Sequence, residues 1–267
     1  MTKPFSLKEV EAIRGYSPKR SRFSDHPVVK PKDKDTYVVS TKFPCVDRLF
    51  KGETGLTTNS GPFGPYCFLS KPSDINKALE WQDQRKDFFF LRDNLTYSVA
   101  MDLNLASEGI YTTLGQAEHD AKADRSAKAV GVLADACARA FEILTPYQGA
   151  DAICPVPPSP DKDWDLPTQI VERLSQKVGK PSLIGQVGFS KKKESVKALA
   201  LEDKWKALEA AGFFASGKVA GKKIVLVDDK YQSGTTIQFV GSKLIEAGAR
   251  YVFGLCPIKT WRDTDNK

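Results

Sequence analysis

The chain has 267 residues, of which 41% are hydrophobic and 27% are charged, and its formal net charge at pH 7 is +7. These proportions are those of an ordinary water-soluble globular protein, and no apolar run approaches the roughly 20 residues that a helix needs to span a bilayer. Because the first residues also lack the apolar core of a signal peptide, we expect a cytoplasmic protein with no membrane partner.

The cysteines and histidines argue against a disulfide framework and against a zinc site. The cysteines are scattered, odd in number and form no Cys-x-x-Cys pair: Cys45, Cys67, Cys137, Cys154 and Cys256. Such spacing is not that of a disulfide-rich protein or a zinc ribbon. The two histidines, His26 and His119, are isolated in the sequence, and we expect both at the surface.

Residues 1–35 are polar and basic and show no sustained hydrophobic periodicity. They contain the cluster Lys19-Arg20-Ser-Arg22 and three further lysines between residues 30 and 34. We expect a basic N-terminal arm. Two interpretations stay open: the arm is a solvated tail, or it contacts nucleic acid through the phosphate groups.

Residues 36–118 form a second region of mixed α and β character. Ser73, directly after Pro72, predicts the start of a helix that runs to about Arg85. From Leu95 to Leu103 apolar and polar residues alternate strictly, which is typical of a half-buried antiparallel strand. We therefore expect this strand to lie outside a parallel core that is covered on both faces.

Residues 119–267 alternate between helical and strand patterns. In chain order we expect a long helix that ends at residues 145–146, a strand at 152–156, a helix at 166–178, a strand at 224–227, a helix that stops at Gly248 and a strand at 251–256. Strand–helix–strand connections of this length demand parallel pairing and a right-handed crossover. The sequence therefore predicts an α/β fold, with a mainly parallel sheet flanked by helices and an N-terminal α+β extension.

The most specific pattern follows the strand at 224–227, where four apolar residues run into two adjacent carboxylates, Asp228 and Asp229. Open α/β folds bind ligands at the carboxyl ends of their strands. The two carboxylates suit vicinal ribose hydroxyls or a divalent metal, and the small polar loop at 232–236 suits a phosphate at a helix N-terminus. A plainer interpretation stays open, in which the Asp-Asp pair only ends the strand and caps the helix.

This stretch resembles the signature of type I phosphoribosyltransferases, which is an apolar strand, two acidic residues and a Thr/Ser-Gly-Thr loop. Within that superfamily the chain is similar to the ComF-type proteins linked to DNA uptake, over roughly residues 109–260. Four weaker features match in chain order: Gly109-Ile-Tyr111, Pro155-Val156-Pro157, Leu166-Pro-Thr-Gln169 and Lys206-x-x-Glu-x-x-Gly212-Phe-Phe214. The resemblance implies a type I phosphoribosyltransferase-like sheet.

The chain departs from the ComF pattern in two places. It has no N-terminal zinc ribbon, and the loop at 158–165 carries one lysine and three aspartates where the family is rich in arginine. In the family this loop holds pyrophosphate. Three aspartates repel that group unless Mg²⁺ intervenes, so the departure bears on turnover of phosphoribosyl pyrophosphate (PRPP) and not on binding of a ribose 5-phosphate group.

The resemblance implies roles for individual residues. Asp228 and Asp229 would hold the ribose hydroxyls, act as the catalytic residues and bind Mg²⁺, the implied cofactor. Further substrate contacts are implied for the loop that follows them: Lys230, Tyr231, Gln232, Ser233, Gly234, Thr235 and Thr236. Three residues would face the pyrophosphate: Val156, Pro157 and Lys162. Three lysines are candidates for a cationic lid: Lys192, Lys193 and Lys197.

Two functions of different classes stay open. One is a phosphoribosyltransferase, a glycosyltransferase that binds PRPP or a nucleotide 5-phosphate and transfers the phosphoribosyl group. The other is a catalytically weak or inactive effector or sensor with the same fold, which works with nucleic acid in DNA uptake, regulation or phage defence. An unrelated α/β enzyme is a third. The sequence does not identify the acceptor, and it leaves open a homo-oligomer or a larger complex.

Overall fold

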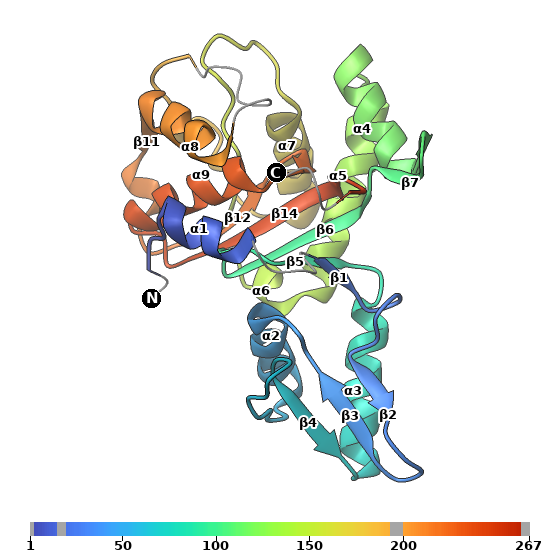
Figure 1. The fold of residues 1–267 in the computed structure, drawn as a ribbon. Coiled ribbons are helices and arrows are strands. Elements are labelled where there is room, and N and C mark those ends of the chain that lie inside the picture. Colours follow the sequence, from blue (N-terminus) through green and yellow to red (C-terminus); the bar gives the residue numbers. More distant parts are fainter. Residues whose placement is uncertain (1–2, 15–19, 193–199, 263–267) are drawn as a thin grey trace. The chain divides into compact units, whose positions relative to one another are not determined.

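The computed structural model describes residues 3–14, 20–192 and 200–262. Contacts divide the chain into unit 1, which comprises Met1–Lys19 and Asp93–Lys267, and unit 2, which comprises Arg20–Arg92 (Figure 1). The helices of unit 1 are α1 (Leu7–Arg14), α4 (Thr113–Asp124), α5 (Ala127–Ile143), α6 (Thr145–Gln148), α7 (Leu166–Val178), α8 (Leu201–Ala210) and α9 (Thr235–Glu246). Its strands are β6 (Tyr97–Leu103), β7 (Leu105–Ser107), β8 (Ile110–Tyr111), β9 (Ala152–Pro155), β10 (Val187–Phe189), β11 (Phe213–Ala215), β12 (Lys223–Val227), β13 (Lys230–Tyr231) and β14 (Tyr251–Lys259).

The core of unit 1 is a parallel sheet. Its strands follow the order β6-β14-β12-β9, and the short strand β13 also pairs with β14. Every one of these pairings is parallel. Strand β12 lies between two neighbours, and its side chains from Ile224 to Val227 are all buried. The expected α/β fold with a mainly parallel sheet is confirmed.

Helices cover both faces of this sheet (Figure 1). Helices α5 and α7 contact each other and pack on one face, where α5 contacts β14 and α7 contacts β9. Helix α9 packs against β12 and β14 on the other face, with α8 beside it. This two-sided cover explains the apolar run in β12, because a strand buried on both faces has no polar side.

Strand β6 differs from the sequence prediction. It pairs parallel with β14, with Val99 opposite Leu255 and Asp102 opposite Ile258. The prediction of an antiparallel strand outside the core is therefore wrong. Ser98, one of the polar residues of this strand, is buried against Gly254 of β14. A side chain at position 254 would overlap the Ser98 hydroxyl. A period of two thus separates the two faces of this strand, and both faces are buried in its middle, at residues 98–100, whereas Tyr97 and residues 101–103 are half-buried.

Helix α7 begins and ends where the sequence indicates. Asp165 is its N-cap, and its carboxylate accepts a hydrogen bond of 3.0 Å from the Thr168 N–H. Gly179 ends the helix with a left-handed backbone, φ 66°. Between these caps the apolar row of the helix, including Ile170 and Leu174, is buried.

We expect Asp165→Ala to lower the free energy of unfolding by about 1 kcal/mol, because an N-cap carboxylate satisfies a helix N–H that alanine leaves unpaired. Urea denaturation with an unchanged slope is the measurement. Asp165→Asn keeps a capping oxygen and is the control. Equal stability of the alanine variant and the wild type would show that the cap contributes nothing.

Unit 2 combines antiparallel strands with two helices. Its elements are β1 (Arg20–Arg22), β2 (Val29–Pro31), β3 (Tyr37–Ser40), α2 (Pro44–Thr54), β4 (Tyr66–Leu69), α3 (Pro72–Arg85) and β5 (Phe89–Leu91). Strands β2, β3 and β4 form an antiparallel sheet in that order, and β1 pairs with β5. Helix α3 ends at Arg85 as predicted, but it begins at Pro72 with Lys71 as its N-cap, so Ser73 lies in the first turn and does not cap it. The helix packs on the three-stranded sheet beside α2.

The boundaries of the two units differ from the limits expected near residues 35 and 119. Residues 20–35 include two paired strands, β1 and β2, where the sequence suggests an arm. The segment before α1 also belongs to unit 1, because Phe5 is buried and its N–H donates to Ser242 Oγ on α9 at 3.1 Å. Residues 15–19 lie outside the described ranges.

None of the five cysteines, all of which lie in the described ranges, forms a disulfide, and Cys137, Cys154 and Cys256 are buried in unit 1, where burial raises the pKa of each thiol. His26 and His119 are both exposed, as expected. Within the described ranges, every helix is too short or too polar to cross a membrane.

Candidate functional site

The candidate site lies where β12 and its neighbours end. Strands β9 and β12 are in register, with Pro155 opposite Val227, and the Val156 N–H donates to the Val227 carbonyl at 2.8 Å. On the other side, the Asp228 N–H donates to the Leu255 carbonyl of β14 at 3.1 Å. The Pro-Val-Pro segment and the acidic pair, which are far apart in the sequence, therefore leave the same edge of the sheet. This is the edge at which open α/β sheets bind ligands.

The acidic pair is held by charges from α4. Lys122 Nζ lies 2.7 Å from Asp229 Oδ2 and 2.6 Å from Glu118 Oε1. Glu118 is 3% exposed, and its Oε1 also forms an ion pair with Lys230 Nζ at 3.0 Å. Asp228 Oδ1 accepts the Asp229 N–H at 2.9 Å. The result is a network of two lysines and two carboxylates beside the partly exposed Asp228.

The network fixes the charge state of Lys122. Burial by itself lowers the pKa of Lys122, but the charges and hydrogen bonds of Asp229 and Glu118 outweigh it and raise the pKa above the ordinary value. Lys122 is therefore a permanent cation beside Asp229. A ribose hydroxyl that binds Asp229 would meet this ammonium group in the same place. Sequence reasoning missed Lys122 and Glu118; their i, i+4 spacing was the only signal, and it is common on helix surfaces.

The polar loop after β13 forms the N-terminus of α9. Gly234 is the N-cap, with φ 67°. The hydroxyls of Ser233 and Thr235 lie 2.9 Å apart, and the Thr235 N–H donates to Ser233 Oγ at 3.3 Å. Gln232 is exposed and Thr236 is half-buried, whereas Thr235 is only 2% exposed. The first N–H groups of α9 point toward this loop, and such groups bind anions.

The Tyr231 ring packs against Gly234 and supports the loop. A Cβ atom at Gly234 would overlap the hydroxyl and the ring of Tyr231. The Tyr231 hydroxyl donates to Asp93 Oδ2 at 3.1 Å, and Tyr231 is itself buried. Gly234 is buried as well, and its loop is therefore not an open surface loop. A larger residue at this position would disturb the fold. Tyr231, which the resemblance places among the ligand contacts, is buried and packs against Gly234.

Asp93 gives this support a pH dependence. Burial raises the pKa of Asp93 from 3.8 to about 6, against the hydrogen bonds from the Leu95 N–H and the Tyr231 hydroxyl. An acid whose pKa is higher in the folded protein contributes stability that is fully present below its unfolded pKa. That contribution is lost as the pH rises through the folded pKa, which is about 6 for Asp93.

We therefore expect Asp93→Asn to flatten the pH dependence of stability. Between pH 4 and pH 7 the wild type should lose about 2–3 kcal/mol of unfolding free energy relative to the variant, because only the wild type ionises this carboxyl. Urea denaturation of both proteins at the two pH values measures the difference. Parallel pH profiles would show that Asp93 titrates normally.

The loop after β9 is less negative than its sequence indicates. Asp161 Oδ2 lies 3.0 Å from Lys192 Nζ, and Asp163 Oδ1 lies 3.2 Å from the guanidinium of Arg125. All four side chains are well exposed, so these pairs add little stability. They do bring two cations to the loop. The predicted contacts differ in exposure: Val156 and Pro157 are buried, and Lys162 is exposed.

Helix α4 connects the two candidate ligand loops. Lys122 in its last turn contacts the acidic pair, and Arg125 at its C-cap contacts the loop after β9. Arg125 has a left-handed backbone, φ 50°, which is uncommon for a residue other than glycine. Lys192 approaches the same loop from the segment after β10, while the lid candidates Lys193 and Lys197 lie outside the described residues.

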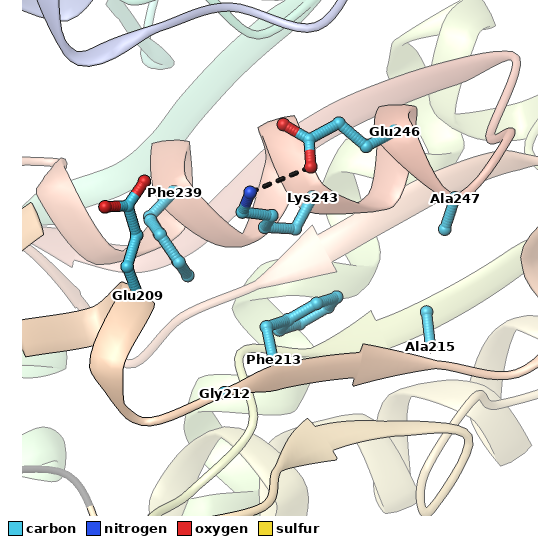
Figure 2. Close-up of a pocket in the computed structure, with 8 residues that line it drawn as sticks. All are labelled: Glu209, Gly212, Phe213, Ala215, Phe239, Lys243, Glu246 and Ala247. Atoms are coloured by element: carbon cyan, nitrogen blue, oxygen red, sulfur yellow. Dashed lines mark hydrogen bonds and ion pairs between the residues drawn. The ribbon is translucent and has the colours of Figure 1, made fainter. Parts of the chain in front are cut away.

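A hollow of about 570 Å³ elsewhere in unit 1 is lined by none of the predicted site residues, although Glu209, Gly212 and Phe213 belong to the run at 206–214 that matches the ComF pattern. Figure 2 shows it between β11 and the outer face of α9, with Phe213 and Phe239 facing the hollow and Lys243 joined to Glu246. Lys243 is already paired at 2.8 Å, and Glu209 and Glu246 would repel an anion. This hollow does not suit a sugar phosphate.

A smaller hollow of about 270 Å³ lies on the same sheet edge as the acidic pair. It is lined by residues that follow β6 and β14, whose ends pair at Leu103 and Lys259. Asn104 accepts the Trp261 N–H at 2.7 Å, and Arg262 lies 3.4 Å from Glu108. No pattern in the sequence indicates this hollow.

The residues that the structure describes contain no group of three or more His, Cys, Asp or Glu side chains that could hold a metal ion. The acidic pair alone offers two carboxylates, and Asp229 already pairs with Lys122. A divalent cation at this place would therefore need oxygen ligands from a substrate. No protein-family model matches the chain, and no curated protein matches it either.

Proposed function

We propose that this protein binds PRPP, or the 5-phosphate end of a nucleotide, at the carboxyl edge of the unit 1 sheet, and that it transfers the phosphoribosyl group. The observation that carries the proposal is the placement of two carboxylates and a glycine-capped helix N-terminus on one sheet edge. Asp228 and Asp229 supply acceptors for two neighbouring hydroxyls, and the start of α9 supplies donors for a phosphate.

The proposal assigns a role to each of these residues. Asp228 and Asp229 hold the ribose 2- and 3-hydroxyls, and the loop from Gln232 to Thr236 holds the 5-phosphate. Lys122 must share Asp229 with the ribose, so it remains beside the sugar as a cation. Lys230 pairs with Glu118 and thereby keeps α4 close to the acidic pair.

The loop after β9 is the proposed pyrophosphate site. Arg125 and Lys192, which pair with its aspartates, supply the positive charge that the loop itself lacks. Mg²⁺ bound to the substrate oxygens and to the acidic pair would neutralise the remaining charge. In the reaction an acceptor forms a bond to C1 of the ribose while the bond from C1 to pyrophosphate breaks. The protein contributes orientation and stabilisation of the positive charge on the ribose ring.

Calorimetry tests the binding step, and pyrophosphate release tests the transfer. The ligands are PRPP, ribose 5-phosphate and AMP, each with and without Mg²⁺, with free ribose as the control. Binding of all three phosphates but not of ribose supports the site. Slow pyrophosphate release from PRPP in the presence of Mg²⁺ supports transfer. Binding without release would instead identify the effector or sensor, and no binding of any phosphate would overturn the proposal.

A further inference from the structure

One face of the three-stranded sheet in unit 2 is basic and aromatic. Lys30, Val38 and Phe68 are paired across β2, β3 and β4, so their side chains form one row on the same face. Their neighbours along the strands form a row on the other face, where Val29, Val39 and Cys67 are buried: that face is covered by α3. The row with Lys30 and Phe68 is open, because both side chains are exposed.

The aromatic part of this face lies on β4. Phe68 is 53% exposed, and Tyr66, two residues earlier on the same strand, packs edge-on against it with the ring centres 5.7 Å apart. Lys32 Nζ lies 4.2 Å from the centre of the Phe68 ring. A half-exposed ring beside a cation is suited to stacking with a flat partner.

The cationic part consists of Lys30, Lys32 and Lys42. In the described part of the chain, no carboxylate lies within ion-pair distance of these three lysines. Burial lowers the pKa of Lys42, and the charge of Lys30 lowers it further, so the two ammonium groups repel each other. Asp33 and Asp35 occupy the turn between β2 and β3, where the Asp33 carboxylate accepts the Asp35 N–H at 3.1 Å. We call Lys30, Lys32, Lys42, Tyr66 and Phe68 the basic face.

We propose that the basic face binds single-stranded nucleic acid, with bases stacked on Phe68 and phosphates paired with the lysines. Charge complementarity favours an anionic partner. The exposed Phe68 ring favours, among anionic partners, one with an accessible flat ring. A duplex hides the faces of its bases inside the stack, and a peptide of acidic residues alone has no flat ring to place on Phe68. A single strand offers both a phosphate backbone and unpaired bases. This surface is independent of the ribose phosphate site in unit 1.

Fluorescence anisotropy of labelled oligo(dT) and oligo(U) with the full chain, at low salt, tests this proposal. Phe68→Ser should weaken binding about tenfold, because each stacked base contributes on the order of that factor. Lys30→Gln with Lys32→Gln should weaken it further and reduce the slope of log affinity against log salt by about 1.4, since each phosphate contact on a single strand contributes about 0.7.

Matched control variants remove an exposed ring, or the same positive charge, from other parts of the protein. Phe214→Ser removes a ring that is 48% exposed on β11. Lys71→Gln with Lys77→Gln removes the same charge from exposed positions at and on α3. Both controls should bind oligo(dT) like the wild type, and thermal melts check that every variant is folded.

Three outcomes would overturn the proposal: no binding of either single strand, equal losses in the controls, or equal affinity for the duplex of oligo(dT) with oligo(dA). Polyglutamate that competes as well as oligo(dT) would also overturn it, because it would identify an acidic peptide as the partner. Failure of these assays leaves the ribose phosphate site untouched, since Phe68 and the lysines lie in the other unit.

Discussion

Asp228→Asn combined with Asp229→Asn should abolish binding of PRPP and of ribose 5-phosphate, with a loss of affinity of about 100-fold or more. Each carboxylate can accept a hydrogen bond from a ribose hydroxyl, and bonds to a charged partner are worth about 1.5–3 kcal/mol each. The amide side chains keep the size of the residues but remove both charges. If the protein is a transferase, release of pyrophosphate should disappear as well.

The stability of this double variant should change little. The sequence suggests that two adjacent carboxylates repel each other and that their removal stabilises the fold. The structure adds two cations, because Lys122 contacts Asp229 and Lys230 contacts Glu118. Relief of repulsion and loss of the ion pair to Lys122 therefore oppose each other, and Glu118 still pairs with Lys122.

Calorimetry alongside a thermal melt measures both effects. Glu142→Gln with Glu172→Gln is the matched control, because it removes two exposed carboxylates from α5 and α7 on the same unit. The control should bind ribose 5-phosphate normally. Normal binding by the variant without Asp228 and Asp229 would show that the pair only ends the strand; the helix that follows is capped by Gly234 and not by either carboxylate.

Gly234→Ala should remove phosphate binding and lower the free energy of unfolding by about 3 kcal/mol. A non-glycine residue in the left-handed region costs about 1–2 kcal/mol. The added methyl group would also displace the Tyr231 ring, and with it the hydrogen bond from Tyr231 to Asp93, which is worth about 1 kcal/mol. Because the loop carries the N-terminus of α9, its displacement moves the proposed phosphate donors.

Gly179→Ala is the matched control for this variant. Gly179 has nearly the same backbone, φ 66° against 67°, but no atom lies within 4 Å of the position of its Cβ. Gly179→Ala should therefore lose only the stability that corresponds to the left-handed backbone, about 1–2 kcal/mol, and keep ligand binding. Tyr231→Ala removes the ring that a side chain at position 234 would overlap. The double variant with Gly234→Ala should therefore lose less stability than the sum of the single variants. Strict additivity would refute the contact between loop and ring.

The sequence determined the elements whose formation depends on neighbouring residues. The apolar run of β12, the acidic pair, the small loop and α9 are consecutive, and each follows from local chemistry: burial on both faces, then loss of apolar residues, then a glycine with positive φ. The caps of α7 are local in the same way, since Asp165 and Gly179 act within one turn. Periodicity and capping are sufficient for such segments.

Only the tertiary structure decided which segments meet. Alternation in β6 separates its two faces, but it does not say whether a partner strand runs parallel or whether a second helix layer covers the polar positions. Residues 20–35 looked like an arm because β1 and β2 are too short to show a period. The pairing of Lys122 with Asp229, and of Arg125 with Asp163, joins segments that are distant in the chain. Surface charges of this kind are frequent, so their partners follow from the packing of α4 and not from any local pattern.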